Sequence, residues 1–478
     1  MSSSSERVAM SAGSDTADRP GRLMRLAPVL TGLTALVCLL GWLQKQPCAS
    51  VRFDFLKTTA NACYTDIYPL YYVRGLSDGK IPYFDALPGS DIHYVEYPVL
   101  SGGFMQLVAW LVQPFGVDAR GMAFYNVTAL ILAVLAIVAV LATAYAAGRR
   151  SLRVGLMVAL SPALLLTAYI NWDLLAVALS ALAVAAWAAR RPALAGALLG
   201  LAIAAKFYPL LFLGPLVLLC VRAGQWRAMG RLFAGTAGAW LAVNLPVMVF
   251  AWDGWKEFYS FSQERGIDWG SIFFVLQDHG LEKPAADTGL LNMLGTGTFL
   301  VLAAGIAVLA LAAPRRPRLA QLMFLVLVAF MLPNKVWSPQ YVLWLLPLAA
   351  MARPKLPAFV AWQVGEVVYF FGIWWFLLSV SGQTPGQDLS GTMSAVLSFD
   401  APEGGISQDV YSLALLARFV TVLLLAALVV RDILRPSADT VRSDGEDDPA
   451  GGLLDGAADV ISLGRWRGAR HAGVPATS

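Results

Sequence analysis

Charged residues are scarce in this chain. Asp, Glu, Lys and Arg make up only 14% of its 478 residues, whereas 58% are hydrophobic and the mean hydropathy is +0.63. A soluble domain carries about 25% charged and about 45–50% apolar residues. The few charges lie between apolar runs that are long enough to cross a bilayer, which takes roughly 20 residues per helix. The composition therefore excludes a soluble enzyme and a nucleic-acid-binding protein, and it predicts an all-α polytopic membrane protein.

Histidine and cysteine are rarer still. The three histidines are His93, His279 and His471, and the four cysteines are Cys38, Cys48, Cys63 and Cys220. None of them form a cluster with the spacing of zinc ligands. We therefore predict neither a metal site nor a cofactor, although carboxylates holding Mg²⁺ stay open as an alternative. Cys48 and Cys63 lie in a segment expected outside the cell, where an oxidising compartment would allow a disulfide between them.

Polar tails are expected at both ends. Residues 1–25 are rich in Ser, Gly, Ala and Asp, and residues 431–478 combine acidic and basic clusters, so both are predicted to be disordered cytoplasmic tails. The apolar run 26–43 is longer than the roughly 7–15 residues of a signal-peptide core, which favours an uncleaved transmembrane helix over a signal peptide. The predicted membrane domain is therefore 26–430.

Clusters of Lys and Arg set the expected topology, because basic residues in short loops stay cytoplasmic. Between successive clusters there is room for two crossings, so we predict about twelve transmembrane helices in the cell membrane, with both termini cytoplasmic. The predicted spans are 26–43, 122–147, 152–169, 173–189, 193–206, 207–221, 232–252, 289–313, 319–333, 339–352, 357–380 and 409–430.

The apolar segment 99–115 is left without a crossing. If it spanned the membrane, every later basic cluster would lie outside, against an orientation bias of about 1 kcal/mol or more per cluster. It also contains Gly102, Gly103, Gln106 and Gln113, which suit a lipid-facing span poorly. We predict a re-entrant or interfacial helix here.

The segment 44–98 is a long extracytoplasmic loop in this topology. Most connections are about 4–6 residues long, and long ordered loops tend to carry function. Its acidic residues are Asp54, Asp66, Asp78, Asp85, Asp91 and Glu96, and basic residues and many tyrosines accompany them. We expect an active site here, although a tyrosine near a membrane surface is often only an interfacial anchor.

Several short motifs together resemble a known family. They are DIYPLYYVRGLSDGKIPY (66–83), EYP (96–98), NWDLL from Asn171, RRPALAG from Arg190, KFYP from Lys206 and NKVWSPQYVLWLLP from Asn334. Each motif alone is weak, but their order and their placement are similar to the polytopic GT-C glycosyltransferases, above all to glycosyltransferase family 87. That family includes actinobacterial polyprenyl-phosphate-mannose-dependent mannosyltransferases. The resemblance covers roughly residues 26–350.

The resemblance implies a GT-C-like fold and a reaction. A sugar, mannose by analogy, would move from a polyprenyl-phosphate donor to a glycolipid or lipoglycan acceptor at the outer face, with inversion and without metal. Arabinose and glucose stay open as the sugar. Two other classes also stay open. A transporter would favour inverted repeats, which the sequence does not display, and a non-catalytic scaffold of the cell envelope would tolerate loss of the loop carboxylates.

Asp66 matches the acidic residue that serves as the base in the family. An inverting transfer needs one carboxylate to take the proton from the acceptor hydroxyl, whereas a phosphate leaves without protonation. Asp54 is the chief alternative base. The alternative role for Asp66 itself is that of a helix cap.

Three cations are candidates for the donor phosphate. Lys206 lies in an apolar stretch, where an unpaired ammonium costs several kcal/mol, so it should face a cavity or a partner unless it snorkels to the interface. Lys335 lies beside Trp337 at an expected outer helix end. Arg74 follows Asp66 by eight residues.

Five residues are candidates for contact with sugar or acceptor. Asp173 and Asn171 lie in the second expected outer turn, and their alternative role is that of helix N-caps. Glu96 directly precedes Tyr97-Pro98, His93 lies three residues before Glu96, and Tyr68 belongs to the same motif as Asp66.

Overall fold

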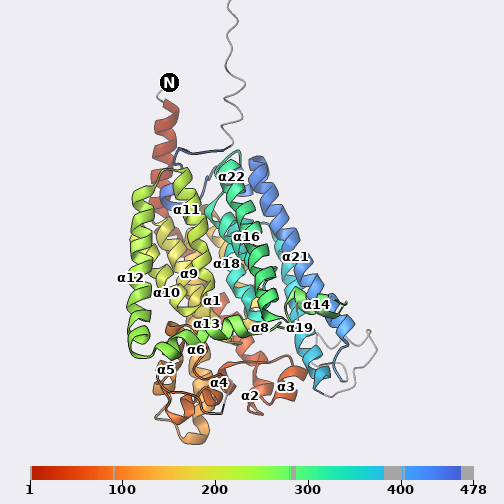
Figure 1. The fold of residues 1–478 in the computed structure, drawn as a ribbon. Coiled ribbons are helices and arrows are strands. Elements are labelled where there is room, and N and C mark those ends of the chain that lie inside the picture. The colour runs from red at the N-terminus through yellow and green to blue at the C-terminus, as the bar shows by residue number, and fades with distance from the viewer. Residues whose placement is uncertain are drawn as a thin grey trace, which may run out of the picture.

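The computed structural model describes residues 3–89, 92–278, 280, 287–381, 401 and 404–463, with side chains from residue 18 onward. Every regular element in these ranges is helical, which confirms the all-α prediction for them. The long helices form one bundle (Figure 1). Four short helices gather at one end of it, which we call the loop end. They are α2 (Gln46–Ala49), α3 (Phe55–Ala60), α4 (Ile67–Val73) and α5 (Val99–Leu111).

Six helices are long and apolar enough to cross a membrane. They are α1 (Ser3–Gln44), of which Asp18–Gln44 forms the candidate span, α6 (Val117–Ala146), α12 (Trp226–Phe250), α16 (Thr288–Ala312), α19 (Leu356–Val380) and α21 (Gln408–Leu434). At 1.5 Å per residue, each exceeds the roughly 30 Å of a hydrocarbon core. The chain is therefore a membrane protein, and the count of twelve crossings stays a prediction.

The remaining predicted spans fall on shorter helices. These are α7 (Ser151–Ala159), α8 (Pro162–Thr167), α9 (Asp173–Ala188), α10 (Pro192–Ala205), α11 (Leu213–Arg222), α17 (Leu319–Met331) and α18 (Val342–Ala352). The expected span 152–169 is divided at Ser161, because the residue before a proline disfavours helical geometry. Extended backbone at Lys206 likewise separates α10 from the 3₁₀ turn η3 (Tyr208–Phe212). With 13 residues, α5 is too short to cross as a straight helix.

Glycines bring α10 and α12 into close contact. A Cβ atom at Gly196 would lie 2.1 Å from the carbonyl oxygen of Leu232, and one at Gly200 would lie 2.4 Å from that of Thr236. Small residues let helix backbones approach, which is how dispersion forces hold helices together in a membrane.

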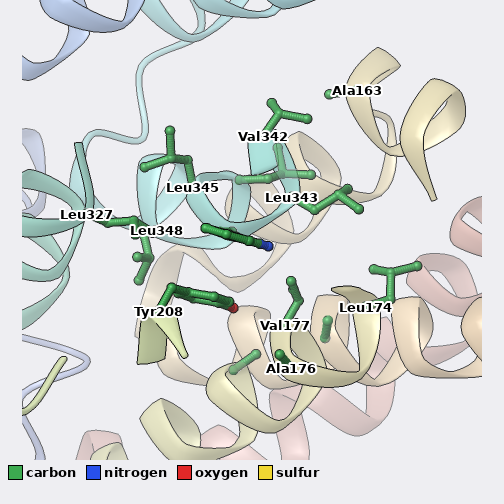
Figure 2. Close-up of a cluster of buried hydrophobic side chains, with 14 of the residues drawn as sticks. Ala163, Leu174, Ala176, Val177, Tyr208, Leu327, Val342, Leu343, Leu345 and Leu348 are labelled. Atoms are coloured by element: carbon green, nitrogen blue, oxygen red, sulfur yellow. The ribbon is translucent and has the colours of Figure 1, made fainter. Parts of the chain in front are cut away.

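Tyr208 packs in the core beneath the break at Lys206. Its ring stacks on that of Trp344, with centroids 4.4 Å apart. Figure 2 shows Tyr208 beside Leu348 of α18 and near Val177 of α9. Packed side chains in the interior of the bundle therefore stabilise the chain directly after the break.

The segment after α21 folds over the end of the bundle opposite the loop end (Figure 1). It contains η5 (Pro436–Ala438), α22 (Thr440–Ser443) and η6 (Gly452–Leu454), and we call residues 436–461 the strap. Asp439 pairs with Arg318 at 2.8 Å, and Asp459 pairs with both Arg222 and Arg316 at 2.8 Å.

The strap corrects the prediction of a disordered tail for residues 431–463. The polar composition of this segment indicated disorder. In the structure, its carboxylates pair with arginines that are distant in the sequence. The expected N-terminal tail 1–25 also differs, because α1 begins at Ser3. Arg19 of that helix donates a hydrogen bond to the carbonyl oxygen of Pro449, 2.7 Å away, and so joins α1 to the strap.

We expect the substitution Gly196→Leu to lower the melting temperature of the purified protein by several degrees. The new side chain would have to push α12 away, and overpacking costs about 1–3 kcal/mol. Gly238→Leu is the matched control, because a Cβ atom at Gly238 of α12 meets nothing within 4 Å. Equal melting temperatures of the two variants would contradict the close packing of α10 on α12.

Candidate functional site

Asp66 lies at the start of α4, where the first loop is tied to the turn before α9. The hydroxyl of Thr65 donates to the carbonyl oxygen of Tyr169 at 2.6 Å, and the backbone N–H of Asp66 donates to that of Ile170 at 2.7 Å. The loop therefore delivers Asp66 to the turn that carries Asn171 and Asp173.

The carboxylate of Asp66 does not cap its helix. It is half-buried and accepts a hydrogen bond from the hydroxyl of Tyr64 at 2.7 Å. The rival Asp54 is exposed, and its side chain accepts from the backbone N–H of Lys57, which caps α3. The cap role therefore belongs to Asp54.

The environment of Asp66 raises its pKa toward neutral pH. Burial raises the pKa of Asp66 to about 6. The hydrogen bond from Tyr64 and the charge of Lys206 oppose this rise, whereas the carboxylates of Asp173 and Glu96 add to it. A carboxylate with a pKa near the working pH has the property that a general base requires.

Lys206 and Asp173 form a buried ion pair at the break between α10 and η3. The ammonium lies 2.7 Å from the Asp173 carboxylate, which also accepts a hydrogen bond from the indole of Trp344 at 2.9 Å. The side-chain oxygen of Asn171 accepts from the backbone N–H of Asp173. Lys206 therefore faces a partner in the interior of the bundle and does not snorkel, and Asn171 orients Asp173.

Aromatic rings surround the Lys206 ammonium. It lies 5.3 Å from the ring centroid of Tyr97 and 5.8 Å from those of Tyr341 and Trp344. Such rings stabilise a cation through their negative faces. The side chain of Lys206 is 15% exposed, so one part of it stays accessible.

Arg74 is fully engaged by Glu96. Two hydrogen bonds of 2.7 and 2.6 Å join its guanidinium to the carboxylate, and both side chains are largely buried. This bidentate pair fastens α4 to the segment before α5 and neutralises both charges. Arg74 is therefore not a free cation for the donor phosphate, and Glu96 is not a free hydrogen-bond acceptor for a sugar hydroxyl.

Two further predicted residues lie apart from Asp66. Tyr68 packs against Phe53 and Tyr72, with ring centroids 5.4 Å away in both cases. The His93 side chain is exposed, while its backbone N–H donates to Glu257. Within the described part of the chain, neither side chain forms a hydrogen bond or an ion pair with Asp66.

Lys335 belongs to a polar network with the segment that follows α13 (Trp252–Glu264). Its ammonium donates to the carbonyl oxygen of Gln263 at 2.9 Å, and its own carbonyl oxygen accepts from the backbone N–H of Asp268. The carboxylate of Asp268 accepts from the hydroxyl of Ser338 at 3.1 Å. The turn 334–338 and the segment 263–268 are thereby held together.

Arg265 is a cation of this network that the sequence interpretation missed. It lies 3.6 Å from Asp268, its side chain is 39% exposed, and its charge is the second cause, after burial, that lowers the pKa of Lys335. It also opposes the rise in the pKa of Tyr64 that the Asp66 charge causes. The charge of Arg265 therefore acts on both Lys335 and Tyr64.

A second buried ion pair, between α19 and α21, holds the turn 334–338 through hydrogen bonds to its backbone. Arg418 of α21 lies 3.0 Å from Glu366 of α19, and it donates to the carbonyl oxygens of Trp337 and Ser338 at 2.8 and 3.2 Å. Its guanidinium also lies 4.1 Å from the ring centroid of Tyr369. A charged residue inside an apolar helix is the signal that would have identified Arg418 from the sequence.

Cys48 and Cys63 are joined by a disulfide, with Cα atoms 6.1 Å apart. It closes the base of the first loop, and Tyr64 follows directly after Cys63. The constraint therefore acts on the segment that positions the Asp66 carboxylate.

Among these groups, Asp66 is a carboxylate whose pKa suits proton acceptance, and Lys206 is the cation whose charge acts on it. The charge of Arg265 acts on Tyr64, the hydrogen-bond partner of Asp66, and Lys335 belongs to the same polar network as Arg265. In the described ranges, no group of three or more His, Cys, Asp or Glu side chains is placed to hold a metal ion.

The comparisons with known proteins give one assignment. A search of curated proteins finds no match. The sequence model described as "Glycosyltransferase family 87" matches residues 94–333, about half of the chain. The match includes Asp173, Lys206 and Arg265, whereas Asp66 and Lys335 lie outside it. The chain belongs to glycosyltransferase family 87, a family of membrane glycosyltransferases.

Proposed function

We propose that this protein transfers a sugar from a polyprenyl-phosphate donor to the hydroxyl of a glycolipid or lipoglycan acceptor, with inversion. Mannose is the proposed sugar, by resemblance to the mannosyltransferases of the family. The observation that carries the proposal is the Asp66 carboxylate, which is half-buried, accepts a hydrogen bond from Tyr64 and feels the positive charge of Lys206.

In the proposed step, the acceptor oxygen forms a bond to the anomeric carbon while the bond from that carbon to the phosphate oxygen breaks. The acceptor proton passes to Asp66, and the polyprenyl phosphate leaves with the bonding electron pair. Positive charge near the phosphate stabilises the negative charge that develops there. No metal or cofactor takes part in the proposal.

Arg265 is the cation that we propose for the donor phosphate, in addition to Lys206 and Lys335. Arg74 is committed to Glu96 by two hydrogen bonds. Arg265 has a long ion pair with Asp268, at 3.6 Å, and lies 5.8 Å from the ring centroid of Phe261. It is the most exposed of the four side chains. Its planar guanidinium can also bind two phosphate oxygens at once.

We place the site on the extracytoplasmic face. Two observations support this side. The Cys48–Cys63 disulfide at the loop end suits an oxidising compartment. The arginines that pair with the strap lie at the other end, as expected for a cytoplasmic face. The scaffold alternative requires no carboxylate at Asp66, so the next experiment separates it from the proposed enzyme.

We expect Asp66→Asn to lower sugar transfer roughly 10²–10⁴-fold, the usual contribution of a general base. The assay combines the purified protein, radiolabelled polyprenyl-phosphate sugars and a membrane extract that supplies acceptors. Asp54→Asn is the control and should retain near-native transfer. Transfer that survives in Asp66→Asn would remove Asp66 from its role, and no transfer by the native protein from any such donor would favour the scaffold.

The pH dependence gives a second test. Transfer should fall about tenfold per pH unit below pH 6, because Asp66 with a pKa of about 6 becomes protonated there and no longer accepts a proton. The hydrogen bond from Tyr64 stabilises the carboxylate, so Tyr64→Phe should raise this pKa and move the acid limb of kcat/KM to higher pH. An acid limb that stays in place, or that moves to lower pH, would contradict the assignment.

We expect Arg265→Gln to raise KM for the donor about tenfold or more, since a hydrogen bond to a charged group contributes about 1.5–3 kcal/mol. KM for the acceptor should change little. Lys256→Gln is the matched control, because Lys256 is also a half-exposed cation and lies on α13, directly before the segment that carries Arg265. Equal effects of the two substitutions on the donor KM would show that Arg265 acts only through overall charge.

A further inference from the structure

An apolar crevice lies between α7, α8 and the first half of α19, and it has no part in the site described above. Its volume is about 500 Å³, within the roughly 300–1,000 Å³ typical of small-molecule sites. We call it the α7–α19 crevice. Its apolar lining includes Leu156, Met157, Leu160, Val360, Val364 and Val368.

The crevice has the length of one membrane leaflet. Its lining on α19 runs from Leu356, the first residue of the helix, to Val368. The twelve steps from Leu356 to Val368, at 1.5 Å each, give about 18 Å. A hydrocarbon core is about 30 Å thick, so the crevice covers about half of it, on the side of the strap.

One wall of the crevice is fixed by a buried polar contact. The hydroxyl of Ser161 and the backbone N–H of Ala163 both donate to the side-chain oxygen of Gln363, at 2.6 and 3.3 Å. This contact joins the start of α8 to α19. The shape of the crevice is therefore set by the protein before anything binds.

Arg153 lines the crevice and is exposed. Nearby arginines at the strap end are neutralised by carboxylates: Arg150 by Asp444, and Arg353 by Asp432. Arg153 forms no such ion pair with any described residue, so its charge remains for an anion. An apolar channel one leaflet long with a cation at its rim matches a lipid with an anionic headgroup.

We propose that the α7–α19 crevice binds one anionic phospholipid of the leaflet on the side of the strap. One acyl chain lies along Leu156, Leu160 and Val364, and the phosphate pairs with Arg153. The lipid would act as a structural ligand, since the crevice is at the opposite end from Asp66. The proposal does not depend on the proposed function.

The experiment measures the lipid that stays with the full-length protein. The native protein and its variants are reconstituted in nanodiscs of phosphatidylcholine with a minority of phosphatidylglycerol, extracted into mild detergent and examined by native mass spectrometry. Arg153→Gln removes the charge, and Val364→Trp fills the crevice from its exposed side. The matched controls are Arg227→Gln, an exposed arginine outside the crevice, and Val420→Trp, an exposed valine on α21.

We expect the native protein and both controls to retain one phosphatidylglycerol per chain, and both crevice variants to lose most of it. Added phosphatidylglycerol should raise the melting temperature of the native protein more than that of Arg153→Gln, because a ligand stabilises the folded state that binds it. Equal retention by all five proteins, or retention of phosphatidylcholine as strong as that of phosphatidylglycerol, would overturn the proposal. A dimer that Val364→Trp disrupts would instead assign the crevice to a second copy of the chain.

Discussion

The buried ion pair between Asp173 and Lys206 is the contact on which the architecture of the site depends. Neither charge is tolerated alone inside a membrane protein, so each holds the other in place. Lys206 ends α10 and Asp173 begins α9, while Trp344 of α18 donates to the same carboxylate. Three helices therefore meet at one point, and the turn before Asp173 receives the loop that carries Asp66.

The same principle explains why the bundle tolerates broken helices. Irregular backbone at membrane depth requires internal partners, because lipid offers none. At the break after α10, the partners are Asp173 and the rings around Lys206. At the turn before α18, Arg418 satisfies two backbone carbonyl groups and pairs with Glu366. Each irregular segment near the site is thus paired with a buried charge from another helix.

Sequence reasoning found the elements whose signals are local. Apolar runs predicted an all-helical membrane protein, and the cost of an isolated ammonium predicted a partner or cavity for Lys206. The sequence does not indicate which cations lack an acidic partner, because the ion pairs join segments that are distant in the chain. Arg74 is neutralised by Glu96, 22 residues later, and Arg265 lies near Tyr64 only in the folded chain. The same applies to the strap, whose acidic composition resembles that of a disordered tail.

The strap also bears on the order of biosynthesis. Its partners include Arg19 on the first helix and, on later segments of the chain, Arg150, Arg222 and Arg318. A chain is made from its N-terminus, and these arginines emerge from the ribosome long before the strap does. The strap can therefore dock only after the last helix has been inserted. Until then these arginines lack their carboxylate partners, so the end of the bundle under the strap is the last part of the protein to be completed.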